Sequence, residues 1–157
     1  MEKYSRIKAL ISLDAIRYNF EQMKKNIKEG TKIIAVIKAD AYGHGAVPIA
    51  RMLEEFDYIW GFAAATAQEA LQLRKAGITR PILILGLVFE EYYKKLAEND
   101  VRMAVCDYET ARKFNKAAEA AGKKGLIHLA ADTGMTRIGF KDSEESLEEI
   151  RRIVALP

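Results

Sequence analysis

The apolar run Ile33-Ile-Ala-Val-Ile37 and the segment Ala46 to Phe56 that follows it form the structural unit that recurs along this sequence. The run has no polar alternation, which predicts a strand buried on both faces, whereas the following segment predicts a helix. Strands of this kind that are joined by crossover helices form a parallel sheet covered by helices. This unit therefore predicts an α/β protein.

The same alternation of strand and helix recurs along the chain. Further strands are predicted at Tyr58 to Ala63, Ile82 to Leu85, Val101 to Val105 and Leu126 to Ala131, with a leading strand at Ile7 to Ile11. The first expected helix has Ile16, Phe20, Met23 and Ile27 on one face and ends at Gly30. Further helices are expected from the cap Thr66 to Gly77, at Glu90 to Glu98, and from the cap Asp107 to Gly122. A last helix is expected after the cap Ser143. Five such units fit either an open doubly wound sheet or an incomplete eight-stranded barrel, and periodicity does not decide between the two.

Composition narrows the class of protein. The chain has 157 residues, of which 50% are hydrophobic, and this excludes a disordered chain and favours one domain. The single cysteine, Cys106, excludes a disulfide scaffold. The first residues do not have the pattern expected of a secretory signal, and no apolar run is long enough to cross a membrane. The basic residues are interleaved with acidic ones apart from Arg151–Arg152. We therefore expect a cytoplasmic protein that acts on small molecules and binds neither nucleic acid nor membrane.

The strongest candidate for chemistry is Lys38, which follows the predicted strand Ile33 to Ile37 directly. Ligands of α/β proteins bind at this end of the strands. A lysine stem among apolar side chains is desolvated, which disfavours the ammonium and makes the amine a better nucleophile for Schiff-base chemistry. The alternative is a lysine whose amine simply reaches solvent, and on spacing alone this is the commoner case.

The residues after Lys38 favour a ligand site. Tyr42-Gly-His-Gly45 precedes a helix, so its glycines permit close backbone approach and its N–H groups can face an anion, to which Tyr42 could donate its hydroxyl. Taken alone, this sequence could equally be a plain turn with a surface histidine.

A second candidate site follows the strand Leu126 to Ala131, at the same end of the sheet as Lys38. The stretch is Asp132-Thr-Gly-Met-Thr-Arg-Ile-Gly139, in which Arg137 offers permanently charged donors for a phenolate, carboxylate or phosphate. By itself Arg137 could also be a loop arginine that pairs with a surface carboxylate.

Taken together, these stretches resemble the alanine racemase family of pyridoxal-phosphate enzymes. The resemblance rests on Ala35-Val-Ile-Lys-Ala-Asp-Ala-Tyr-Gly-His-Gly45 and on His128-Leu-Ala-Ala-Asp-Thr-Gly-Met-Thr-Arg-Ile-Gly139, and it extends in order through Ile11 to Asn19, Glu69 to Ile78 and Pro81 to Gly86. It implies a TIM-type (β/α) barrel, here with about five of eight βα units. It also implies a cytoplasmic isomerase that interconverts L- and D-alanine for cell-wall precursor supply and forms a homodimer at full length.

The resemblance also implies roles for single residues. Lys38 would hold pyridoxal 5'-phosphate covalently and act as the base on one face of the substrate's α-carbon. Tyr42 would bind the cofactor phosphate, and Arg137 would donate to the phenolic oxygen of the cofactor and lie near the substrate carboxylate. No metal is implied.

Two departures from the family pattern affect these expectations. The position two residues before Asp132, often a carbamylated lysine that braces the arginine, is Ala130 here. Residues 1–157 correspond to the N-terminal part of the barrel domain, without the C-terminal β domain that supplies the second base. We therefore expect this chain alone not to racemise alanine at an enzyme-like rate. Two alternatives remain: a pyridoxal-phosphate-binding protein without catalysis, and a racemase or decarboxylase of the same fold for another amino acid.

Overall fold

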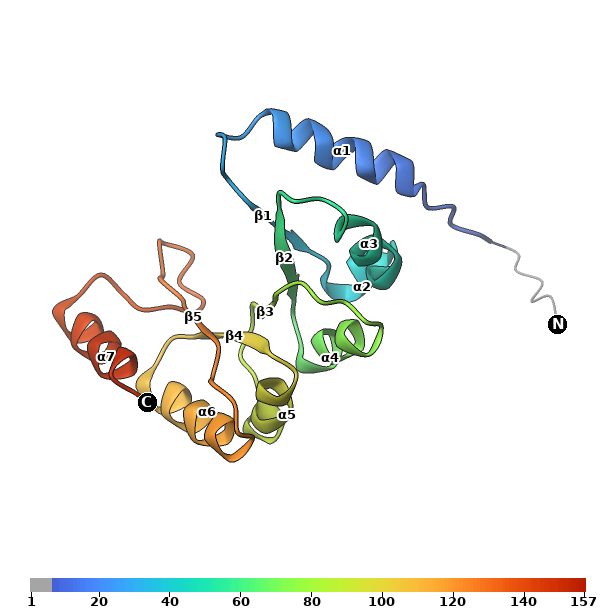
Figure 1. Cartoon of the computed structure of the whole chain (residues 1–157). Helices are drawn as coiled ribbons and strands as arrows, with labels where there is room; N and C mark the ends of the chain where they lie inside the picture. The colour runs from blue at the N-terminus through green and yellow to red at the C-terminus, as the bar shows by residue number, and fades with distance from the viewer. Residues whose placement is uncertain (1–6) are drawn as a thin grey trace.

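The structure, a computed structural model, describes residues 7–157 and contains one parallel sheet (Figure 1). Its strands are β1 (Ile33–Val36), β2 (Ile59–Ala64), β3 (Ile82–Ile84), β4 (Val101–Val105) and β5 (Ile127–Leu129). Each strand pairs with the next one along the chain, so the spatial order is β1-β2-β3-β4-β5. A doubly wound sheet reverses its strand order at a switch point, whereas a barrel does not. The observed order is that of an incomplete TIM-type barrel.

The helices follow the strands along the outside of an arc (Figure 1). They are α1 (Leu13–Lys25), α2 (Lys38–Gly43), α3 (Ala46–Leu53), α4 (Ala67–Lys75), the short 3-10 helix η1 (Glu90–Tyr92), α5 (Tyr93–Glu98), α6 (Tyr108–Ala120) and α7 (Glu144–Val154). The three predicted caps are confirmed, because Thr66, Asp107 and Ser143 each accept a hydrogen bond from the backbone N–H three residues on.

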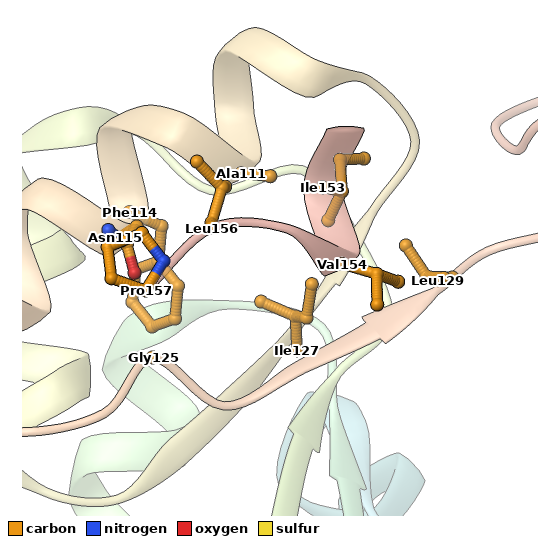
Figure 2. A pocket seen from close by; sticks show the side chains of 10 residues that line it. All are labelled: Ala111, Phe114, Asn115, Gly125, Ile127, Leu129, Ile153, Val154, Leu156 and Pro157. Atoms are coloured by element: carbon orange, nitrogen blue, oxygen red, sulfur yellow. The ribbon is translucent and has the colours of Figure 1, made fainter. Parts of the chain in front are cut away.

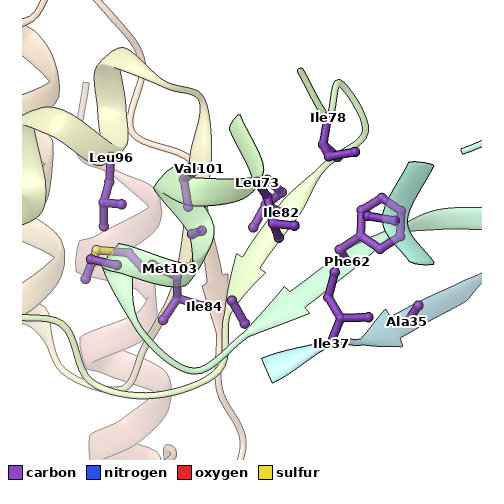
Figure 3. Close-up of a cluster of buried hydrophobic side chains, with 14 of the residues drawn as sticks. Ala35, Ile37, Phe62, Leu73, Ile78, Ile82, Ile84, Leu96, Val101 and Met103 are labelled. Carbon is purple, nitrogen blue, oxygen red and sulfur yellow. The ribbon is translucent and has the colours of Figure 1, made fainter. Parts of the chain in front are cut away.

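The hydrophobic core lies between the sheet and these helices (Figure 3). Ile82 and Ile84 of β3 are completely buried, as are Val101 and Val105 of β4. Burying one such side chain stabilises the fold by roughly 1.5 to 3 kcal/mol. This packing makes the strands rigid supports for the residues that follow their carboxyl ends.

Two predictions at the N-terminal end of the described chain are wrong. Residues 7–12 form no strand, and Leu10 is 91% exposed. Figure 1 shows this segment running away from the sheet beyond α1, so the apolar run has no strand beside it to pair with. The first helix ends at Lys25 with Asn26 as its cap, so Ile27 and Gly30 lie beyond it.

Among residues 7–157, no helix is both long enough and apolar enough to cross a bilayer. The same residues contain no group of three or more His, Cys, Asp or Glu side chains arranged to hold a metal ion.

Candidate functional site

Lys38 lies at the carboxyl end of β1, as the sequence predicts. The buried Ile37 continues the pairing beyond β1, since its N–H donates to the Ala63 carbonyl at 2.9 Å. The backbone leaves the sheet at Lys38, whose side chain is half-buried. The last paired residue therefore fixes the point from which the amine projects.

The segment after Lys38 is a left-handed helical turn. Ala39, Asp40, Ala41 and Tyr42 have φ between 49° and 54° and ψ between 39° and 48°. This conformation costs non-glycine residues about 1 to 2 kcal/mol each, so four in succession need support from their surroundings. The sequence did not predict this turn, because the four residues include no glycine that would mark a positive φ.

One support for this turn comes from helix α4. The carboxylate of Glu69 accepts the N–H of Ala39 at 2.8 Å through Oε1, and it accepts the N–H groups of Ala65 at 2.7 Å and Thr66 at 3.3 Å through Oε2. Sequence reasoning missed Glu69 as part of the site. Its signal, a Thr-x-x-Glu capping box at the start of a helix, pointed only to the helix end.

The far end of the turn is supported by Asp40. Its Oδ1 accepts the N–H of Ala46 at 2.7 Å and so caps α3 in place of Gly45, which has no side chain to do so. The Gly45 N–H donates to the Asp40 carbonyl, and His44 Nδ1 lies 3.1 Å from the Ala41 carbonyl oxygen. The Gly-His-Gly turn is present, with positive φ at both glycines. The prediction that its N–H groups face an anion is wrong, because those of His44, Gly45 and Ala46 donate to Ala41 and Asp40.

Tyr42 lies beside Lys38 on the outer surface of this turn. Its ring centre is 5.9 Å from the lysine Nζ, and the residue is 62% exposed. The phenol hydroxyl is therefore open to solvent and accessible to a ligand that reaches Lys38.

Arg137 lies on a loop that leaves β5 and returns to it. Ala131 and Phe140 form a bridge, and within the loop Asp132 Oδ1 accepts the N–H groups of Thr136 at 2.9 Å and Gly134 at 3.0 Å. These two bonds, first the one from Thr136, hold the pKa of the Asp132 carboxyl below its usual value. Arg137 itself is exposed, and within residues 7–157 its side chain makes no hydrogen bond or ion pair. Ala130 therefore has no counterpart elsewhere among residues 7–157 that holds the Arg137 side chain.

Lys38 and Arg137 line the same cleft, of about 370 Å³, at the carboxyl ends of the strands. Its remaining lining residues are Ala65, Leu85, Gly86, Leu87 and Ile138. The cleft thus combines an amine that can bond to a carbonyl carbon, a guanidinium that can bind an anion, and apolar walls for a flat ring. Tyr42 is not among the lining residues.

A somewhat larger cavity, of about 450 Å³, lies elsewhere, between α6, β5 and α7 (Figure 2). Its walls are almost entirely apolar, with Phe114, Ile127 and Ile153 prominent among them. The lining contains no titratable side chain, so this cavity has no group that could carry out acid, base or nucleophilic chemistry.

Arg102, Trp60 and His128 form a cluster on the face of the sheet opposite the core. Arg102 stands between Val101 and Met103, which are in the core, so alternation places it on the opposite face. Its guanidinium carbon is 5.1 Å from the ring centre of Trp60, and the His128 ring centre is 5.5 Å from the same ring. Burial lowers the pKa of His128, and the charge of Arg102 lowers it further. None of these three residues lines the cleft at Lys38.

Residues 11–157 match the family described as "Alanine racemase, N-terminal domain". A protein named alanine racemase from Clostridium kluyveri is 43% identical over 157 residues, which is 99% of this chain and 39% of the relative. One from Methanococcus maripaludis is 42% identical over 145 residues, which is 92% of this chain and 39% of the relative. The chain therefore spans about two fifths of the length of these relatives.

Solved structures show the same relationship. The alanine racemase of Clostridium difficile 630 in complex with cycloserine superposes with a TM-score of 0.90 at 44% identity, over 94% of this chain and 40% of that one. The histidine racemase of Leuconostoc mesenteroides superposes with a TM-score of 0.81 at 33% identity, over 93% of this chain and 39% of that one. Two racemases named for different substrates thus share this part of the fold.

Proposed function

The chain belongs to the alanine racemase N-terminal domain family, and on that premise we propose that it is the cofactor-binding part of a pyridoxal-phosphate-dependent alanine racemase. The observation that carries the proposal is the common cleft of Lys38 and Arg137. These residues come from segments about a hundred positions apart in the sequence, and the parallel sheet brings both to one edge.

The residues of the cleft fit pyridoxal phosphate. The amine of Lys38 is the group that an aldehyde requires, and Arg137 supplies a permanent charge for the phenolate oxygen. Leu85, Leu87 and Ile138 offer apolar surface to the faces of a pyridine ring. The exposed hydroxyl of Tyr42 beside Lys38 is available to the phosphate.

In this proposal the residues of the chain divide the work of binding and proton transfer. When bound, the cofactor delocalises the charge left on the substrate's α-carbon. Lys38 binds the cofactor and moves a proton at one face of that carbon through its Nζ. Arg137 orients the cofactor oxygen and the substrate carboxylate. Catalysis by positioned acid and base groups of this kind contributes typically 10²- to 10⁴-fold.

Borohydride trapping tests the assignment of Lys38. The chain is mixed with pyridoxal phosphate, reduced and digested, and the modified peptide is identified by mass. We expect modification to concentrate at Lys38 and to disappear in Lys38→Ala. The control Lys24→Ala, on the outer helix α1, should leave the modification unchanged. Modification spread evenly over exposed lysines would refute the assignment.

The number of bases in the cleft gives a second test. Lys38 and Arg137 are the basic side chains among the described residues that line the cleft, and an arginine is not deprotonated in proteins, which leaves Lys38 as the single candidate base there. We therefore expect the 157-residue chain, with excess cofactor, to exchange the α-hydrogen of alanine with deuterium, preferentially from D-alanine, without inverting it. Mass spectrometry measures the exchange and optical rotation measures the inversion. Efficient interconversion of the two enantiomers would show that a second base acts within this chain, and Tyr42 would be the first residue to mutate.

A racemase of the same fold with another amino-acid substrate is the second candidate, favoured by the histidine racemase neighbour. Deuterium exchange measured in parallel on alanine and histidine separates the two. A pyridoxal-phosphate carrier without catalysis would bind the cofactor at Lys38 and exchange neither.

We also propose the wider setting that the family resemblance implies. Residues 1–157 are the N-terminal part of a barrel domain. The full-length protein acts in the cytoplasm as a homodimer and supplies D-alanine for cell-wall precursors. Sedimentation of the full-length protein and fractionation of its host cells test these statements.

A further inference from the structure

We propose that Glu69 is a positioning residue for Lys38, in addition to its part in capping α4. Its carboxylate holds the left-handed turn from which the amine projects. The inference rests on the proposed function only in taking Lys38 as the cofactor lysine. The geometry that supports it concerns this chain alone.

The first argument is where the three hydrogen bonds of Glu69 go. A capping box needs the N3 carboxylate to bind only the N-cap N–H, which here is the bond to Thr66 at 3.3 Å. The two shorter bonds go elsewhere, to Ala39 at 2.8 Å and to Ala65 at 2.7 Å. Ala39 is the residue after Lys38, and Ala65 is the residue after β2. The shorter and therefore stronger contacts of Glu69 tie the ends of two neighbouring strands together.

The second argument is that the Ala39 N–H needs such a partner. It lies in the first turn of α2, where backbone N–H groups have no acceptor within the helix. The turn is strained at four successive residues, so it persists only if its ends are fixed. Ile37 is fixed by its bond to Ala63, and Asp40 is fixed by its bond to Ala46. Glu69 fixes the residue between them that adjoins the lysine.

The third argument is that a glutamine cannot replace this carboxylate. All three partners are N–H donors, and they are shared between both oxygens of Glu69. Glutamine has one acceptor oxygen and one donor NH₂ group. The amide orientation that keeps more bonds directs the oxygen at the N–H groups of Ala65 and Thr66, which share one carboxylate oxygen in the wild type. The NH₂ group then faces the N–H of Ala39, so the end of the turn at Lys38 is released.

Amide hydrogen exchange in the absence of cofactor tests the inference directly. In Glu69→Gln we expect the Ala39 amide to exchange about 10- to 100-fold faster than in the wild type, the loss expected for a charge-assisted bond. The matched control is Thr66→Ala, which removes the other half of the capping box and leaves the Glu69 carboxylate in place. It should speed exchange in the first turn of α4 and leave Ala39 within about twofold. Equal effects of both variants on Ala39, or no effect of Glu69→Gln, would overturn the proposal.

The consequence for Lys38 is measured by the borohydride reaction at limiting cofactor. Relative to adducts on the exposed Lys25, the adduct on Lys38 should fall about 10-fold or more in Glu69→Gln and stay unchanged in Thr66→Ala. A wild-type chain that forms no adduct on Lys38 would refute the proposed function, while the exchange of Ala39 would still decide the role of Glu69.

A measurement on the wild type covers the case in which Glu69→Gln does not fold. An amide bound to a carboxylate changes its proton chemical shift when that carboxylate is protonated. The Ala39 and Ala65 amides should therefore move together, along one acid titration curve. Two different curves, or a shift in Ala65 alone, would overturn the proposal.

Discussion

The turn at Lys38 and the loop at Arg137 face each other across one cleft, but they are held in different ways. The lysine turn is fixed from outside by Glu69 of α4 and is tied to α3 through Asp40. The arginine loop is fixed largely from within, because Asp132 binds the amides of Gly134 and Thr136 in the same loop.

The two residues differ in how much conformational freedom their side chains lose when a ligand binds. A fixed backbone determines the point from which a side chain projects, so a ligand has to order only the rotamers of that side chain. Arg137 is exposed and makes no side-chain hydrogen bond within residues 7–157, so binding must order its long side chain. The backbone is fixed on both sides of the cleft, and the difference lies in the side chains. Lys38 is half-buried, whereas Arg137 is exposed and has more rotamer freedom to lose when it binds an anion.

A comparison of two glycines should show the largest effect. A Cβ at Gly139 would lie 2.5 Å from the Asp132 nitrogen and 2.7 Å from the Ala131 carbonyl carbon, whereas a Cβ at Gly43 would meet nothing within 4 Å. Both have positive φ. We expect Gly139→Ala to lower the free energy of unfolding by about 2 to 4 kcal/mol, and Gly43→Ala by about 1 kcal/mol. Urea denaturation measures both, and equal losses would contradict the close packing of the arginine loop.

Substitution of Arg137 tests whether this exposed arginine contributes to cofactor binding. If it binds the phenolic oxygen of the cofactor, Arg137→Ala removes a charge-assisted bond and should weaken binding about tenfold to a hundredfold, or roughly 1.5 to 3 kcal/mol. Arg51→Ala, on the outer face of α3, is a control of the same charge change and should leave the affinity unchanged. Spectroscopic titration with pyridoxal phosphate gives the dissociation constants. An unchanged affinity in Arg137→Ala would mean that the arginine stays detached.

Asp40→Ala tests whether the turn at Lys38 is held independently of the loop at Arg137. It removes the acceptor of the Ala46 N–H and should cost about 1 kcal/mol, as for other helix N-caps. Because the left-handed turn adjoins this cap, exchange of amides 39–45 should rise while amides 131–140 stay as in the wild type. A rise in both segments would show that the two sides of the cleft are not held independently.

The smallest effect should be the pH response of the arginine loop. Asp132 has its pKa held below the usual value by the amides of Thr136 and Gly134, so its bonds are present above the unfolded pKa. They are lost only as the pH falls through the lowered folded pKa. We expect the Gly134 and Thr136 amides to become labile in acid, and Asp132→Asn, whose oxygen cannot titrate, to remove this dependence. Persistence of the acid response in Asp132→Asn would assign it to another group.

Several features of both regions could be predicted from the sequence. The five strands, the three caps and the placement of Lys38 and Arg137 at one edge of the sheet follow from apolar periodicity and cap residues. The strand at Ile7 to Ile11 was wrong because periodicity does not show whether a pairing partner is present. The turn at Ala39 to Tyr42 was missed because its support comes from Glu69, which is 30 residues away in sequence. Local propensity predicts segments that are stable by themselves, and this turn is not stable without its distant partners.

The dependence of this turn on distant residues has a consequence for the order of folding. The left-handed turn cannot be stable before β1 has paired with β2 and α4 has begun at Thr66, because its bonding partners are placed only then. We therefore expect the turn to form after the rate-limiting step, with φ-values near zero. Strain at such a position hardly slows refolding but shortens the lifetime of the native state. The segment that presents the reactive amine is thus among the last parts of the chain to form and the first to open.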